Sequence, residues 1–230
     1  MARDDEASAV VMRLLAHDLR NPLSAVQLNA QLIERAATEA GLEKEQRWAA
    51  LIAKAARRMD GMIQQLVEAE RLRLGQLQLK RELVAWEQVW RDTLAENDMD
   101  LDPRRVRLAL PGKRIMVSVD RDRLRCALRG LLCLALQEAD GAAVVAVESK
   151  ATDGEVVSAI HAPRASVMGS VYAPTTGADA VPPWVPGSAF HFARTTFECH
   201  GGSLRVKTGD SQAAGFELVL PTSTATSART

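Results

Sequence analysis

The residues with the clearest chemical potential lie close together near the N-terminus, in the run Leu14–Leu23, which reads LLAHDLRNPL. Apolar residues recur here at steps of three and four, so the run predicts a helix whose apolar stripe leaves His17 facing solvent. Asp18 follows His17 directly, and Asn21 lies one helical turn further along on the same face. Pro22 lacks a backbone N–H, so we expect a kink in the helix beside these side chains.

This group of side chains suits transient phosphorylation of the imidazole. A neutral ring nitrogen is a competent nucleophile near neutral pH. Asp18 is placed to orient the ring or to accept its proton, and Asn21 to position a water molecule or an attacking carboxylate. The alternative is a solvated helix face that carries His, Asp and Asn by chance. The combination of all three residues with the predicted kink favours the phosphorylation site.

The run from His17 to Leu23 resembles the H-box of sensor histidine kinases of the dimerisation and histidine-phosphotransfer type. That pattern is specific: His, then Asp or Glu, two further residues, Asn or Thr, and Pro. The resemblance implies that His17 is the phosphoacceptor and that Asp18 is the acid/base residue. It also implies that Asn21 serves in phosphotransfer or dephosphorylation.

The composition is that of an ordinary globular protein. The chain has 230 residues, of which 47% are hydrophobic and 25% charged, enough for one large or two small domains. Its formal net charge is zero, which points away from nucleic acid and anionic membranes as partners. No apolar run approaches the roughly 20 residues that span a membrane, and the N-terminus does not resemble a signal peptide. We therefore expect a cytoplasmic protein.

Cysteine and histidine usage gives no support to a structural metal site. The cysteines are Cys126, Cys133 and Cys199, an odd number with no Cys-x-x-Cys pair, which argues against a disulfide framework and fits a reducing compartment. His161, His191 and His200 match no common zinc-binding spacing. We interpret these histidines as ordinary surface or partly buried residues.

The first third of the chain predicts two long amphipathic helices, over about residues 5–40 and 43–74, which end at Gly41 and Gly75. The apolar stripes are Val11, Leu15, Leu19, Leu23, Val26, Ala30 and Ile33 on the first helix, and Ile52, Met59, Ile63, Leu66 and Ala69 on the second. A short turn joins the helices into an antiparallel hairpin that leaves apolar surface uncovered. Because both stripes are long, we predict a homodimer in which two hairpins form a four-helix bundle, rather than a hairpin packed on its own C-terminal half.

From residue 76 the pattern changes to an α+β sandwich, with helices on one face of a mixed sheet. Strands are predicted at 77–80, 106–110, 115–119, 142–148, 155–160, 203–207 and 215–220, and helices at 84–96, 120–139 and 188–200. Residues 161–186 are rich in Pro, Gly, Ala and Ser and predict a loop. The predicted domains are therefore a helical hairpin over 5–75, an α+β domain over 76–221 and a disordered tail over 222–230.

The order of these elements is similar to the ATP-binding domain that follows the bundle in histidine kinases, so the resemblance covers about residues 5–221. In that family a helix Asn binds the Mg²⁺ that bridges the ATP phosphates, and the matching position here is Leu134, which offers no oxygen ligand. Gln137 replaces the usual basic residue, and His161 stands about where an Asp reads adenine. At a Gly-rich helix start, Gly187 remains but Ala189 replaces the second glycine. The resemblance thus implies a degenerate nucleotide site, with no ATP and no metal ion of its own.

Together these patterns predict a dimeric histidine phosphotransferase of a bacterial two-component relay. The phosphoryl group would reach His17 from the phospho-aspartate of a response-regulator receiver domain, which supplies the Mg²⁺, or leave by the reverse route. Two alternatives stay open: an active histidine kinase with an atypical nucleotide site, and a non-enzymatic pseudokinase that regulates a partner kinase or regulator. Phosphatase action on a receiver through Asn21 lies between these readings.

Overall fold

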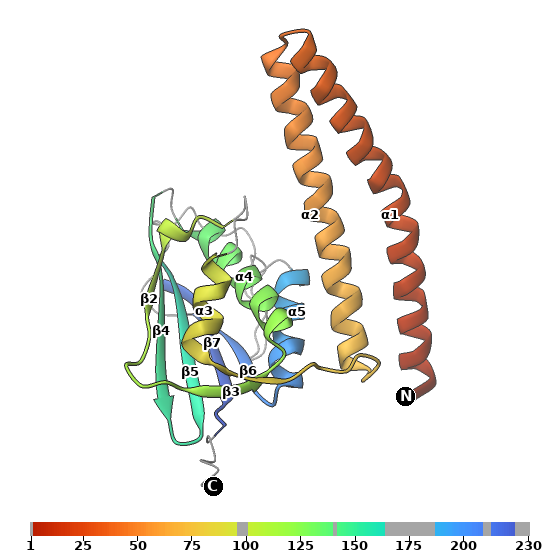
Figure 1. Ribbon diagram of the computed structural model, residues 1–230. Helices are drawn as coiled ribbons and strands as arrows, with labels where there is room; N and C mark the ends of the chain where they lie inside the picture. The colour runs from red at the N-terminus through yellow and green to blue at the C-terminus, as the bar shows by residue number, and fades with distance from the viewer. Residues whose placement is uncertain (1, 96–100, 140–141, 164–186, 209–212, 224–230) are drawn as a thin grey trace, which may run out of the picture. The chain divides into compact units, whose positions relative to one another are not determined.

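The computed structural model describes residues 2–95, 101–139, 142–163, 187–208 and 213–223. It divides into two compact units, Met1–Leu77 and Gln78–Thr230 (Figure 1). The first unit is helical and the second combines helices with strands. This is the predicted architecture, an N-terminal helical hairpin followed by an α/β sheet domain.

The helical unit consists of α1 (Ala2–Glu39) and α2 (Glu43–Arg73). Both helices end where glycine was expected to end them, because Gly41 and Gly75 adopt φ angles of 71° and 66°. These angles lie in the left-handed region, which glycine enters without the steric cost that a Cβ imposes. The turn at Gly41 reverses the chain and makes α1 and α2 antiparallel neighbours (Figure 1).

Mostly small residues form the contact between α1 and α2. Among the side chains that the structure describes in this unit, the buried ones are Ala16, Leu23, Ala30 and Ala37 on α1, and Ala49, Ala53, Ala56, Ala69 and Leu72 on α2. Four of them recur every seven residues on α1, the spacing of a seam that faces a neighbouring helix. Alanine at such contacts lets two helix axes approach closely.

The large apolar residues of the predicted stripe lie outside this seam. Leu19, Val26 and Ile33 on α1 are 53%, 44% and 50% exposed, and Ile52 and Met59 on α2 are 46% and 54% exposed. The sequence predicted one stripe on α1, whereas the structure separates it into a buried seam, which includes Leu23 and Ala30, and an exposed row beside it. The physical reason is that a single partner helix covers only part of a broad apolar face.

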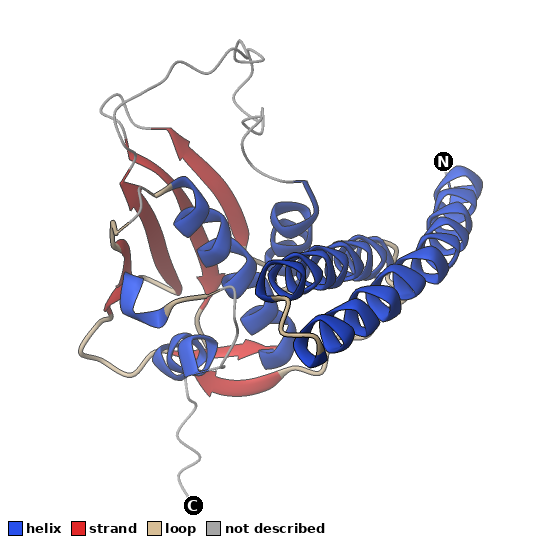
Figure 2. Ribbon diagram, turned by 90° about the horizontal axis from the view of Figure 1, so that it is seen from above, coloured by secondary structure: helices blue, strands red, loops and turns tan. Residues whose placement is uncertain are grey.

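Among its described residues, the second unit contains two sheets and three α-helices. A two-stranded sheet pairs β1 (Glu82–Ala85) with β3 (Met116–Val119), and a five-stranded sheet has the order β2-β4-β5-β7-β6. The remaining bounds are β2 (Val106–Ala109), β4 (Val145–Thr152), β5 (Glu155–Pro163), β6 (Ser203–Thr208), β7 (Ala213–Pro221), α3 (Trp86–Ala95), α4 (Arg121–Glu138), α5 (Gly187–Cys199) and a 3₁₀ turn at Pro103–Arg105. The helices cover one face of the larger sheet (Figure 2).

Buried aromatic residues join the helices to this sheet. Trp86 of α3 is 1% exposed, and its Nε1 donates to Ser158 Oγ at 3.0 Å and to Ser149 Oγ at 3.3 Å. The two serines lie side by side on β4 and β5 and are themselves 2.7 Å apart. A buried indole N–H therefore has its acceptors, as a low-dielectric core requires.

One detail of the second unit differs from the sequence prediction, and another goes beyond it. Residues 77–80 do not form the predicted strand; the strand in this part of the chain is β1, which begins at Glu82. Lys80 instead donates its backbone N–H to the Asp120 carboxylate at 2.9 Å. The sequence predicted a strand on either side of Pro111 without assigning partners, and in the structure β2 runs parallel to β4 while β3 pairs with β1. Alternation of apolar residues predicts a strand but not its neighbour, which long-range packing selects.

Two predicted segments fall largely outside the described residues. Of the predicted loop 161–186, only His161, Ala162 and Pro163 are described, and they belong to β5. Of the predicted tail 222–230, only residues 222 and 223 are described. The loop and tail assignments therefore stay predictions.

Candidate functional site

The H-box residues lie on α1, in the helical unit. Asp18 and Asn21 are exposed to solvent, whereas the His17 side chain lies outside the described part of the structure. Pro22 lies inside α1, which bows along its length (Figure 1). The structure thus places three of the predicted site residues within one turn of a single helix, as their spacing requires.

The flanks of this turn are packed against α2. Ala16 and Leu23 are 5% and 7% exposed, so packing supports the helix on both sides of Asp18 and Asn21. Arg20 reaches across to α2, where its Nε donates to Asp60 Oδ1 at 3.1 Å. Sequence reasoning did not single out Arg20 and Asp60, although Arg20 lies in the H-box run itself.

The positions related to nucleotide binding lie in the second unit, on α4, α5 and β5. Leu134 is 4% exposed and belongs to the apolar core of this unit, whereas Gln137 on the last turns of α4 is exposed. An aliphatic side chain at position 134 supplies no oxygen for a hard cation such as Mg²⁺. Position 134 therefore contributes to packing.

The other two elements are β5 and α5, where His161 and Ala189 differ from the residues that the resemblance implies. His161 is exposed on β5, where its backbone is paired with Ala146 and Gly215. Gly187 is the first residue of α5, and Ala189 packs close to α4: a Cβ added to Gly130 would lie 3.4 Å from the Ala189 Cβ. A methyl group thus stands where the resemblance implies a phosphate-cradling glycine.

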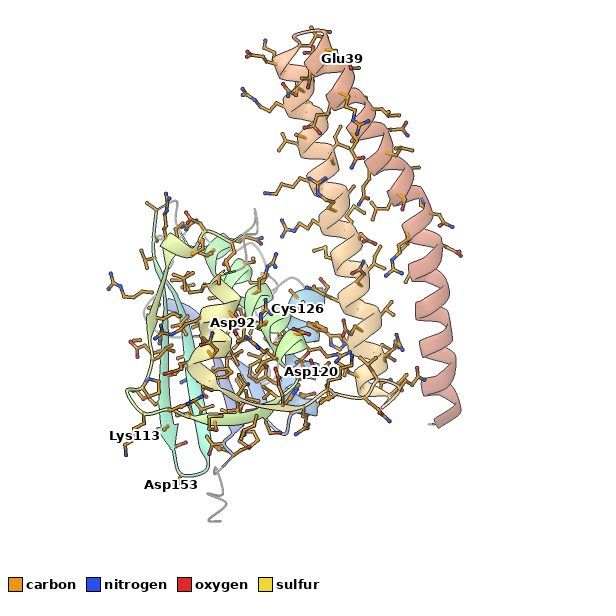
Figure 3. The ribbon with its side chains drawn as sticks, in the orientation of Figure 1. Glu39, Asp92, Lys113, Asp120, Cys126 and Asp153 are labelled. Carbon is orange, nitrogen blue, oxygen red and sulfur yellow. The ribbon has the colours of Figure 1, made fainter. Side chains whose placement is uncertain are left out.

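A polar cluster that the sequence did not predict lies where α4 begins. Asp120 is the N-cap of α4, is 3% exposed, and accepts hydrogen bonds from the backbone N–H groups of Lys80 and Arg123 and from the Arg123 guanidinium (Figure 3). Burial alone would raise the pKa of Asp120, but these hydrogen bonds outweigh it and hold the pKa below its usual value. Arg81 donates to the Cys199 carbonyl at 2.6 Å. The consecutive residues Lys80 and Arg81 are therefore hydrogen-bonded to the start of α4 and to the end of α5, respectively.

His200 joins this cluster from the end of α5. It is 1% exposed, its Nε2 accepts the backbone N–H of Asp120 at 2.8 Å, and its Nδ1 lies 2.7 Å from the Thr196 carbonyl. Nδ1 therefore carries the proton, and the ring is neutral. Burial lowers the pKa of His200 below its ordinary value, against an opposing hydrogen bond to Thr196.

We expect acid to destabilise the protein through His200. The unfolded chain takes up a proton at the ordinary pKa of about 6.5, while the folded protein resists protonation because Nε2 must accept a hydrogen bond. The free energy of unfolding should therefore fall as the pH drops below about 6.5, by at most about 1.4 kcal/mol per pH unit from this group. Urea denaturation of the full chain at pH 7.5, 6.5 and 5.5 measures the effect. His200→Gln should remove this component, whereas His191→Gln, at an exposed position on α5, should leave it unchanged.

Within the described ranges, no group of three or more His, Cys, Asp or Glu side chains is placed to hold a metal ion. Over the same residues, no helix has the length and apolar character needed to cross a membrane.

Comparison with known proteins assigns a family to the hairpin. Residues 11–75 match the model of the His Kinase A (phospho-acceptor) domain, a span that contains the whole H-box and both helix ends around Gly41. No curated protein sequence matches the chain.

Solved structures of histidine kinases share the overall fold. Full-length ShkA in complex with AMPPNP has a TM-score of 0.63 and 18% identity over 93% of this chain, which spans only 46% of the ShkA chain. The histidine kinase AdeS of Acinetobacter baumannii has a TM-score of 0.56 and 16% identity, covering 89% of this chain and 97% of its own. A histidine kinase from Burkholderia phymatum STM815 has a TM-score of 0.50 and 18% identity, covering 96% of this chain and 97% of its own. At these identities the likeness establishes the fold.

Proposed function

Because residues 11–75 form a His Kinase A phospho-acceptor domain within a sensor histidine kinase fold, we propose that this protein exchanges a phosphoryl group between His17 and the aspartate of a receiver domain. The observation that carries the proposal is the match of the hairpin to the phospho-acceptor domain, with Asp18 and Asn21 exposed beside His17. Such an arrangement leaves the site open to a protein partner.

In the proposed step an imidazole nitrogen of His17 attacks the phosphorus of an aspartyl phosphate on the receiver. The acyl phosphate P–O bond breaks, a P–N bond forms, and the receiver's aspartate leaves as a carboxylate. The receiver contributes the Mg²⁺ that neutralises the phosphoryl oxygens, so this chain needs no metal ligands of its own. Asp18 accepts the imidazole proton or orients the ring, and Asn21 positions the attacking or leaving group.

We further propose that ATP is not the source of the phosphoryl group. The support is chemical: Leu134 is a buried aliphatic residue, Gln137 carries no charge, and Ala189 stands in place of a glycine at the start of α5. Autophosphorylation from ATP needs oxygen ligands for Mg²⁺ and backbone N–H groups that approach the phosphates closely. The second unit keeps the fold without these groups and serves as a structural or docking domain.

Phosphoryl labelling tests the proposal. The purified chain is incubated with γ-labelled ATP and Mg²⁺, and separately with receiver domains from the same genome that have been phosphorylated with labelled acetyl phosphate. We expect no label from ATP and acid-labile label from at least one receiver. Acid-labile label from ATP would instead identify an active kinase, and no label from either source would indicate a regulatory pseudokinase.

A further inference from the structure

An ion pair bridges the two helices of the hairpin beside the H-box. We propose that Arg20 and Asp60 are positioning residues that fix the His17 turn of α1 against α2 for transfer to a protein partner. The inference rests on the proposed phosphotransfer at His17. It assigns a role to two residues that make no contact with the reacting atoms in that scheme.

The geometry of the pair is well defined. Arg20 follows His17 by three residues, and its Nε donates to Asp60 Oδ1 at 3.1 Å. The other carboxylate oxygen, Oδ2, accepts a hydrogen bond from Gln64 Nε2 at 2.9 Å, one turn further along α2. Gln64 therefore holds the carboxylate in the orientation that receives Arg20.

The H-box is also the place where α1 most needs such a tie. Pro22 has no N–H, so the Asp18 carbonyl loses its helical donor, and the pyrrolidine ring crowds that carbonyl. Apolar packing fixes α1 at Ala16 and Leu23, on either side of the weakened turn. Arg20 adds a tie to α2 between these two contacts.

The pair is too exposed to serve mainly as a stabilising contact. The Arg20 and Asp60 side chains are 43% and 31% exposed, and ion pairs at such positions contribute little to the free energy of unfolding. The ion pair can have a larger effect through the position of the His17 turn, because a displacement of about 1 Å can change the rate of a group transfer by up to about a hundredfold. We therefore expect the pair to affect transfer rate more than stability.

Two phosphoryl donors separate positioning from imidazole reactivity. A receiver domain must dock on the hairpin before His17 can reach the receiver's phospho-aspartate. The rate of transfer from a receiver therefore depends on where α1 lies relative to α2. Phosphoramidate is a small donor that needs no docking: the imidazole attacks phosphorus, the bond to nitrogen breaks, and ammonia leaves. When the label is counted on His17 separately from the exposed His161 and His191, this rate reports the reactivity of the His17 imidazole.

The test compares full-length variants with both donors. Arg20→Gln and Asp60→Asn should each slow saturating transfer from the receiver by about tenfold, while the reaction with phosphoramidate stays within about twofold of wild type. The charge-exchanged double variant, Arg20→Asp with Asp60→Arg, should recover most of the lost rate. Arg71→Ala, an exposed charge change further along α2, should leave both reactions unchanged.

Amide hydrogen exchange gives a readout that does not depend on a receiver. In the single variants the amides of residues 17–21 and of Leu23 should exchange about tenfold faster than in wild type, and the double variant should restore protection. Unchanged exchange would overturn the proposal, as would equal slowing with both donors. If no receiver phosphorylates the wild-type chain, the proposed function fails, yet the exchange data still decide whether this pair fixes the turn.

Discussion

His17→Gln should abolish phosphoryl acquisition from any receiver, lowering the rate to less than about a thousandth of wild type. Glutamine approximates the size and polarity of histidine but has no nucleophilic nitrogen, because the amide lone pair is delocalised. The position lies on the helix face that carries exposed Asp18 and Asn21, so the folded hairpin should be retained. The measurement is acid-labile label on the purified chain after incubation with a phosphorylated receiver domain.

Asn21→Ala provides the matched comparison within the same helical turn. This variant keeps the nucleophile, so it should still acquire label, more slowly than wild type because the amide no longer positions the reacting group. Label on the His17→Gln variant would contradict the assignment of the phosphoacceptor. Loss of receiver dephosphorylation in Asn21→Ala, with partial activity kept in His17→Gln, would reveal a phosphatase in place of a phosphotransferase.

The elements that the sequence predicted well are those with strong local signals. The periodicity of α1 and α2, together with Gly41 and Gly75, gave both helix ends to within a few residues, because glycine alone enters the left-handed region freely. Likewise the run after Asp120 gave α4, whose N-cap is that aspartate. These features depend on neighbouring residues and need no knowledge of the tertiary fold.

The features that the sequence did not reveal depend on distant parts of the chain. Lys80 binds Asp120 and His200 receives the Asp120 N–H across separations of 40 and 80 residues, which no periodicity encodes. The Arg20–Asp60 pair is intermediate: a hairpin that turns at Gly41 brings residue 20 opposite a residue near 60, so register could have suggested it. Its geometry, with Gln64 holding the carboxylate, required the structure.

The exposed apolar row of the hairpin predicts the oligomeric state. Leu19, Val26, Ile33, Ile52 and Met59 are each roughly half exposed. Completing their burial contributes about 1 kcal/mol for each side chain, or on the order of 10 kcal/mol for two hairpins, before the entropic cost of association. A second copy presents the same row, so a symmetric pair covers both. We therefore propose a homodimer built on a four-helix bundle.

Val26→Glu combined with Ile52→Glu should convert this dimer into a monomer, because four carboxylates would have to be buried without partners in the bundle core. Light scattering after gel filtration should give twice the 25.0 kDa of one chain for wild type and the single-chain mass for the double variant. Leu28→Glu is the matched control, since Leu28 is 58% exposed but two residues, or about 200°, around α1 from Val26. A wild-type mass of one chain, or dissociation by Leu28→Glu alone, would place the interface elsewhere. Dimer loss with retained labelling of His17 by phosphoramidate would show that the chemistry of the imidazole does not require the second copy.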